Sequence, residues 1–177
     1  MDKNEIIAAL AGNHQHFRDD LLNLGTTEFT SSPPGKWTPG QHFQHIILAV
    51  SPLVVAFRLP TFILKLLFGK TNRPSRSFEE LVTKYKDKLA QGGRATGRFV
   101  PRAVSYAQRD RLVRKYNRNI QALQSLVAKT SEADLDDYIL PHPLLGKLTL
   151  REMLYFTIHH VKHHHDLVKA GVYNLAK

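Results

Sequence analysis

The chain has 177 residues, which is enough for the core of one domain and short for two. Hydrophobic residues make up 42% of it and charged residues 23%, a balance that excludes disordered and fibrous proteins. Twenty-five Lys and Arg against fifteen Asp and Glu leave a net charge of +10, which favours an anionic partner such as nucleic acid, a membrane surface or a small acidic ligand.

Cysteine is absent from the sequence. Its absence excludes disulfide scaffolds, thiolate nucleophiles, iron–sulfur clusters and zinc sites that use sulfur, so a metal ion would have to be held by His, Asp or Glu. The N-terminal residues include Asp2 and Glu5 and lack the cationic and long apolar regions of a secretory signal. We therefore expect a cytoplasmic protein with a single domain over residues 1–177.

The first helix is predicted from a capping box formed by Asp2 and Glu5, after which apolar residues recur at helical spacing. Gly25 is its expected stop, and a loop rich in Pro, Gly and Ser follows over 26–36.

A second helix is predicted from the capping residues Thr38 and Gln41. We expect it to kink or end near Val50, because Pro52 follows shortly after.

An apolar stretch over 46–69 is long enough to span a bilayer. Two internal prolines and the cations Arg58 and Lys65 argue against a membrane span. A buried helical turn or a surface for homodimerisation is the preferred interpretation.

The remaining elements are also predicted to be helical. Capping residues and periodicity indicate helices over 77–89, 105–129 and 149–171, with a Gly- and Arg-rich loop over 91–102 and a short helical turn over 131–138. The residues between 138 and 149, with two prolines and a glycine, are expected to form a tight connection. The sum is an all-α protein, a four-helix bundle with an inserted helical segment between the second and third long helices.

Histidines are concentrated in the last helix, where five of the ten lie between residues 159 and 165. His160 and His164 lie on the predicted core face four residues apart, so both imidazoles can converge on one ion. His159 and His163 have the same spacing on a partly polar flank, and His165 is expected to face solvent. Coincidence is the commoner explanation of one such pair, but two inward imidazoles are costly to bury without a partner.

A third ligand is expected on a facing helix, and the second helix supplies His45, with His42 one turn earlier as a neighbour. His45, His160 and His164 would form a three-nitrogen site with positions left open for water or substrate, as in catalytic metal sites. Taken alone, an inward His45 is better explained as a hydrogen-bonded core histidine. His14 is expected in the core or beside the site.

Two motifs carry a family resemblance. Trp37-Thr-Pro-Gly-Gln-His-Phe-Gln-His45 and His160-Val-Lys-His163-His164 resemble the DinB/YfiT-like superfamily in order and spacing. The resemblance implies a four-helix bundle with a three-histidine divalent metal site, usually zinc or nickel, whose ligands correspond to His45, His160 and His164.

Relatives in that superfamily are similar to metal-dependent hydrolases and to transferases of low-molecular-weight thiols, including mycothiol and bacillithiol. The resemblance therefore implies an enzyme acting on a small molecule, with a thiol as a possible cosubstrate. His163 and His42 are the candidate catalytic residues, as partners of the ligands or as proton carriers. Glu152 is two turns from His160, and no carboxylate is an obvious general base.

The main alternative rests on residues 94–118, where eight cations accompany the single acid Asp110. In this alternative, a non-catalytic bundle binds an anionic partner through its basic and apolar segments. The same cations could instead attract an acidic substrate or simply be solvated. No motif of sequence-specific nucleic-acid binding is present.

Overall fold

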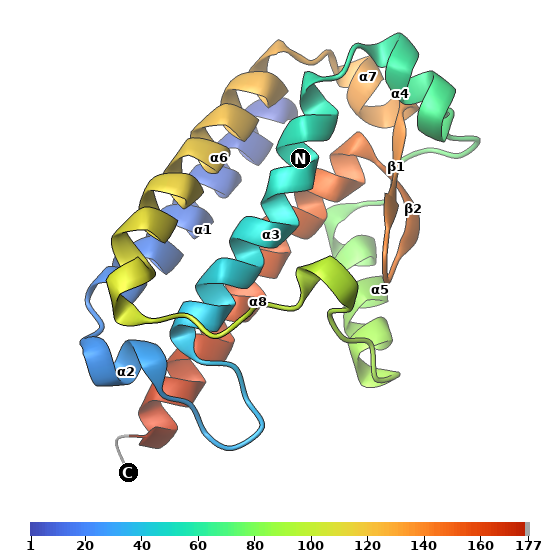
Figure 1. The fold of residues 1–177 in the computed structure, drawn as a ribbon. Helices are drawn as coiled ribbons and strands as arrows, with labels where there is room; N and C mark the ends of the chain where they lie inside the picture. Colours follow the sequence, from blue (N-terminus) through green and yellow to red (C-terminus); the bar gives the residue numbers. More distant parts are fainter. Residues whose placement is uncertain (176–177) are drawn as a thin grey trace.

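Four long helices form the body of the protein: α1 (Lys3–Leu22), α3 (Pro39–Arg58), α6 (Arg109–Lys129) and α8 (Leu150–Leu175). In the computed structural model, which describes residues 1–175, α1 and α3 each pack against both α6 and α8 (Figure 1). The last two residues of the predicted domain lie outside the described residues. The predicted all-α bundle is confirmed.

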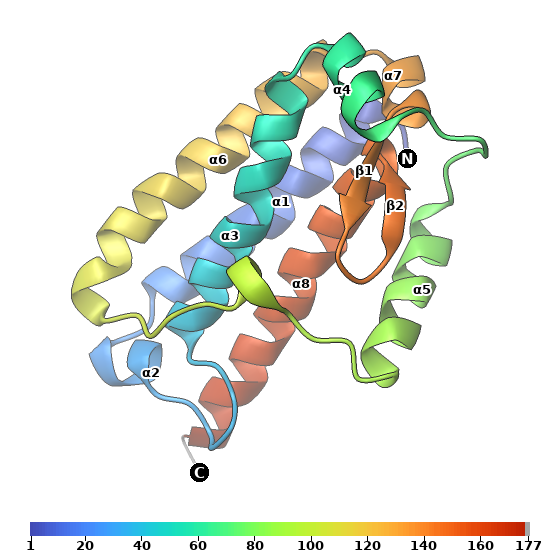
Figure 2. The ribbon, with the colours of Figure 1, turned by 45° about the vertical axis from the view of Figure 1, so that its right-hand side comes forward.

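The inserted segment connects two helices that begin at the same end of the bundle, α3 and α6 (Figures 1 and 2). The chain must therefore return along the length of the bundle between them. It does so through α4 (Thr61–Phe68), α5 (Phe78–Ala90), and the 3₁₀ turns η1 (Gly97–Phe99) and η2 (Tyr106–Gln108). Helix α5 packs against α8, and the chain through η1 then crosses in front of α3.

The predicted helix starts are confirmed by reciprocal side-chain to backbone hydrogen bonds, which satisfy amides that have no partner inside the helix. The capping pairs are Asp2 with Glu5, Thr38 with Gln41, Ser77 with Glu80, and Thr149 with Glu152.

The sequence predicts that the second helix kinks or ends near Val50, and an end there is wrong, because α3 continues through Pro52 to Arg58. Beyond the proline, Leu53 and Phe57 are buried in the core, which offsets the lost backbone hydrogen bond. Next to the proline, the hydroxyl of Ser51 donates a hydrogen bond to the Ile47 carbonyl.

Two other boundaries differ from the sequence predictions. The loop expected after the first helix contains the short helix α2 (Thr26–Thr30), for which Gly25 is the N-cap. The last helix does not stop at Gly171 but extends to Leu175.

A two-stranded hairpin replaces the tight connection expected before the last helix. It consists of β1 (Ile139–His142) and β2 (Gly146–Thr149), after α7 (Glu132–Asp137). The paired residues Leu140 and Leu148 are both buried. Neither strand alternates between buried and exposed residues, so neither carries the pattern by which a strand is predicted from sequence.

Helix α3 is the one helix in the described residues that is long and apolar enough to cross a membrane. Most of it is buried inside the bundle, so this is weak evidence for a span. The apolar stretch 46–69 is also interrupted at Leu59, the C-cap of α3, before α4 begins. These features agree with a core helix, as the sequence predicts.

Candidate metal centre

Three histidines converge in the core, His45 from α3 and His160 and His164 from α8. The Nε2 atom of His160 lies 3.2 Å from Nε2 of His45 and 3.0 Å from Nε2 of His164. Nitrogens that are about 2.1 Å from one divalent ion lie about 3.0–3.4 Å from each other. The spacing therefore fits a metal ion, and all three side chains are buried.

Hydrogen bonding alone does not account for this convergence. In a neutral ring the Nε2 atom of His160 either donates its one hydrogen or accepts with its one lone pair, so one good hydrogen bond leaves the other close contact unexplained. A shared cation would instead accept all three lone pairs. The three-histidine group could therefore hold a metal ion, as the spacing of His160 and His164 predicts.

The ring of His45 is fixed by a backbone group from the inserted segment. Its Nδ1 lies 2.7 Å from the carbonyl oxygen of Phe99 in η1. Because the carbonyl can only accept, Nδ1 carries the hydrogen and the Nε2 of a neutral ring is left with a free lone pair. In metal sites, a hydrogen bond at the other ring nitrogen usually fixes the tautomer and orientation of a ligand histidine. Nothing in the sequence identified Phe99.

Burial keeps these rings uncharged. It lowers the pKa of His45, although the hydrogen bond to Phe99 partly opposes the shift. Burial and then the neighbouring imidazoles hold the pKa values of His160 and His164 well below the usual range. At neutral pH all three rings are therefore neutral, which is the form that binds metal.

His42 lies against His164, with their Nδ1 atoms 2.7 Å apart. Burial, followed by the charges of His45 and His163, lowers the pKa of His42 to about 4. With both rings neutral, one Nδ1 must donate to the other, and donation from His164 leaves the Nε2 of His164 free for a metal ion.

Aromatic side chains surround the three histidines. Trp37 is stacked against His164 with 6.0 Å between ring centroids, and Phe156 is stacked on His160 at 4.6 Å. Tyr85, from α5, meets His160 edge-on at 6.1 Å. These bulky neighbours restrict the rotation of the imidazoles.

The remaining histidines of the last helix divide between two surroundings. His163 lines the same cavity as the three converging rings and lies edge-on to Tyr85. His159 also faces Tyr85, on the flank that the sequence predicts. The prediction that His165 faces solvent is wrong, because its Nε2 lies 2.7 Å from the carboxylate of Asp20 on α1.

Two further histidines line the cavity. The Nδ1 of His142, in β1, accepts the backbone N–H groups of Leu144 and Leu145, so its Nε2 carries the hydrogen. His142 lies in a hairpin that the sequence did not reveal, and no spacing rule pointed to it. His14 is buried on α1, with Nδ1 2.6 Å from the Tyr116 hydroxyl and Nε2 without a hydrogen-bond partner among the described residues.

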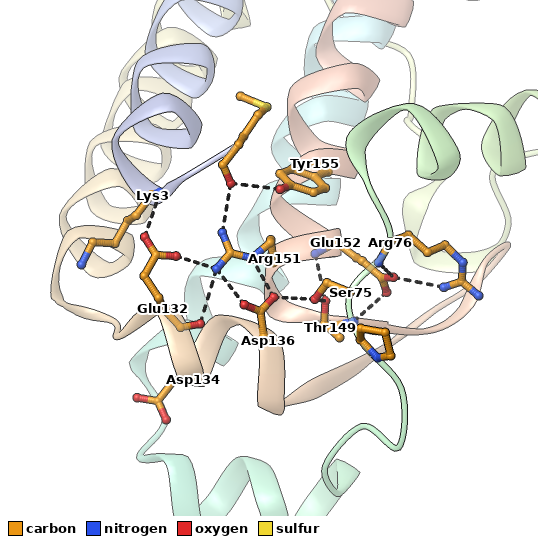
Figure 3. A network of polar contacts seen from close by, with 12 residues as sticks. Lys3, Ser75, Arg76, Glu132, Asp134, Asp136, Thr149, Arg151, Glu152 and Tyr155 are labelled. Carbon is orange, nitrogen blue, oxygen red and sulfur yellow. Dashed lines mark hydrogen bonds and ion pairs between the residues drawn. The ribbon is translucent and has the colours of Figure 1, made fainter.

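Glu152 has a structural role at the start of α8. Its fully buried carboxylate accepts hydrogen bonds from the guanidinium groups of Arg73 and Arg76 and from the backbone amides of Arg76 and Thr149. Figure 3 shows Glu152 with Arg76 and Thr149 beside the ion pairs of Arg151. These partners occupy both carboxylate oxygens, so Glu152 is not available as a general base.

The basic segment divides into two parts with different surroundings. Arg94 and Arg98 line the cavity beside the three histidines. Arg111, Arg114 and Arg118 are exposed on α6. Of the eight cations in the segment, Arg94 and Arg98 are the two that line the cavity.

A comparison with protein families bears on this arrangement. The sequence matches the DinB superfamily over residues 20–168, a span that contains all three converging histidines. Among the curated proteins compared, none matches the chain. The four-helix bundle and the buried histidine group agree with the resemblance seen in residues 37–45 and 160–164. The chain therefore belongs to the DinB superfamily.

Proposed function

We propose that the protein is a metal-dependent enzyme that acts on a small molecule, as a hydrolase or as a transferase of a low-molecular-weight thiol. His45, His160 and His164 would hold zinc or nickel. One observation carries the proposal. The Nε2 atom of His160 lies 3.2 Å from that of His45 and 3.0 Å from that of His164, and the three residues line a cavity of about 890 Å³. Cavities of this size bind small ligands.

A divalent ion in this site would act as a Lewis acid that activates water or stabilises the thiolate of a thiol cosubstrate. The carbonyl of Phe99 and the ring of His42 would orient His45 and His164 for this purpose. Neither chemistry requires a cysteine of the protein, in agreement with the composition.

His163 is the proposed proton carrier. It lines the cavity one residue before the ligand His164, and it is only partly buried, so protons can exchange with solvent. His142 would donate its Nε2 hydrogen to a polar group of the substrate. His42 is better placed as a positioning residue, because its Nδ1 is engaged with His164.

The first test is elemental analysis of tag-free protein purified without added metal. We expect about one zinc or nickel ion per chain, lost in His160→Ala because two nitrogens rarely suffice for tight binding. His16→Ala is the matched control, because His16 is exposed on α1. Absence of metal from the wild-type protein, with none taken up on titration, would overturn the proposal.

The reaction class is tested on metal-loaded protein with thiol and ester substrates. Loss of free thiol that depends on both the metal and His163 would support transfer. Hydrolysis without a thiol requirement would support a hydrolase. If His163→Ala retains the wild-type rate across the pH range, His163 is not the proton carrier.

A second candidate function is binding of an anionic macromolecule without catalysis, favoured by the exposed Arg111, Arg114 and Arg118 on α6. Salt-sensitive binding to heparin or to nucleic acid without sequence preference would support it. Retention of that binding in a variant with all three arginines changed to glutamine would contradict it.

We also propose that the protein forms a homodimer through the apolar stretch 46–69. Its proposed location is the cytoplasm. The dimer is supported by exposed apolar side chains on α4, including Phe62 and Leu66. Cell fractionation tests the location.

A further inference from the structure

The cavity at the histidine centre extends along most of one helix. His42 and His45 line it near the start of α3, and Val55 and Leu59 line it at the other end. With a rise of about 1.5 Å per residue, His45 and Leu59 are about 21 Å apart along the helix axis. The same cavity continues past His164 to Gly171 on α8, about 10 Å along that helix, so the three-histidine group lies between this shorter arm and a longer arm that leads towards α4.

The wall of this arm is apolar. Ile46, Ala49, Val50 and Leu53 form one face of α3 in it, and Phe68 lines its far end. Such a wall offers dispersion contacts and hydrophobic burial but few hydrogen bonds to a hydrophilic ligand. The arm therefore suits a hydrocarbon tail better than a sugar or peptide.

Three cations line the cavity, Lys36, Arg94 and Arg98, and no Asp or Glu among the described residues does so. Arg98 precedes Phe99, whose carbonyl contacts His45, and Lys36 precedes Trp37, whose ring lies 5.0 Å from that of His45. Lys36 and Arg98 therefore each precede, in the chain, a residue that contacts His45. None of them forms an ion pair within the described part of the chain. The guanidinium of Arg98 lies over the Phe99 ring, 5.1 Å from its centroid, and has no anionic partner among residues 1–175.

We propose that the substrate is an anionic amphiphile, a molecule with a carboxylate or phosphate near its reacting group and an extended apolar tail. The anionic group lies by Arg94 and Arg98, the reacting group lies at the three histidines, and the tail occupies the arm along α3. This inference rests on the proposed function for its reaction but not for its binding site. It favours lipid-like substrates over hydrophilic thiol conjugates.

The binding test uses decanoate as the probe, titrated by calorimetry into metal-free, chelator-treated protein. Acetate and decyltrimethylammonium separate the contributions of tail and charge. Because each buried methylene contributes about 0.8 kcal/mol, acetate should bind at least about 100-fold more weakly than decanoate. Decyltrimethylammonium should also bind more weakly, since its head group meets cations of the same sign.

Variants then locate the probe. Ala49 is one turn after His45 and only partly buried, so Ala49→Phe fills the arm without replacing a core side chain. We expect it to weaken decanoate binding at least about tenfold, and the smaller Ala49→Leu to weaken it less. Ala8→Phe, on the exposed face of α1 and outside the cavity, is the matched control and should leave binding unchanged.

The charge is tested with Arg98→Gln and Arg94→Gln against Arg114→Gln, which removes the same charge from α6 outside the cavity. Because the cations are exposed, we expect a loss of about two- to fivefold for each cavity variant and none for Arg114→Gln. Thermal melting and metal uptake of each variant establish that the fold is intact.

Binding of decanoate that Ala49→Phe leaves unchanged, or equal binding of decyltrimethylammonium, would overturn the inference. Metal uptake without decanoate binding would agree with the proposed function and contradict the proposal of an amphiphilic substrate. Decanoate binding to a protein that takes up no metal would support the amphiphile site and contradict the metal-dependent reaction.

Discussion

The Nδ1 atom of His42 lies 2.7 Å from the Nδ1 atom of His164, across the interface between α3 and α8. This contact joins the first turn of one bundle helix to a candidate metal ligand on another. Trp37 restricts both rings, because it meets His42 edge-on and is stacked on His164. His42 therefore controls the orientation of His164 without being one of the three converging nitrogens.

The first prediction concerns His42. His42→Ala should leave the fold intact and weaken metal affinity about 10- to 100-fold, because removing the partner of a ligand leaves that ligand free to rotate. His42→Asn should restore part of the affinity, since its amide can pair with His164. Affinity is measured by competition with a chromophoric chelator. Wild-type affinity in His42→Ala would show that the contact does not position His164.

The second prediction concerns the pH dependence of the metal-free protein. Burial lowers the pKa of His14 to about 3, and burial followed by the charges of neighbouring groups lowers the pKa values of His42 and His142 to about 4. Their pKa in the unfolded chain is near 6.5. The folded state therefore binds fewer protons than the unfolded state between those values, so the free energy of unfolding must fall as pH drops.

Urea denaturation with a chelator present, at intervals from pH 7 to pH 4.5, measures this fall. Each fully buried imidazole contributes up to about 1.4 kcal/mol per pH unit below pH 6.5. His14→Phe should have a shallower dependence, by about one proton. A free energy of unfolding that is constant from pH 7 to pH 5 would contradict neutral, buried histidines.

The third prediction tests whether the role of Glu152 is structural or catalytic. Glu152→Ala leaves Arg73 and Arg76 without their shared carboxylate and should destabilise the protein by about 3 kcal/mol or more. Glu152→Gln should cost less, because it retains part of the hydrogen bonding. Metal content per folded chain should be unchanged in both variants. Loss of metal from stable Glu152→Gln protein would show that the carboxylate acts at the metal centre.

The fourth prediction concerns self-association through α4. Phe62 and Leu66 are 67% and 79% exposed, and Val55 and Leu67 are each 58% exposed nearby in the sequence. Apolar side chains gathered in this way favour an interface. Light scattering should detect a dimer at high concentration, and Leu66→Glu should return it to a monomer. A wild-type protein that remains monomeric at all concentrations would contradict the proposed dimer.

The sequence by itself determined the helix starts and the histidine pair of the last helix. Asp2 with Glu5 and Thr38 with Gln41 are predictable because a capping box joins residues three apart, whatever the rest of the chain does. His160 reaches the same face as His164 by helical geometry alone. Motif spacing then supplied His45 as the third member of the group.

Only the tertiary structure decided which distant groups complete the site. The Phe99 carbonyl, the His142 ring and the cations of the η1 segment reach the cavity because the inserted segment returns across the bundle. Burial of Leu53 likewise carries α3 past Pro52 against its local preference. Such contacts depend on the summed packing free energy of segments far apart in the chain, which no short window of sequence contains.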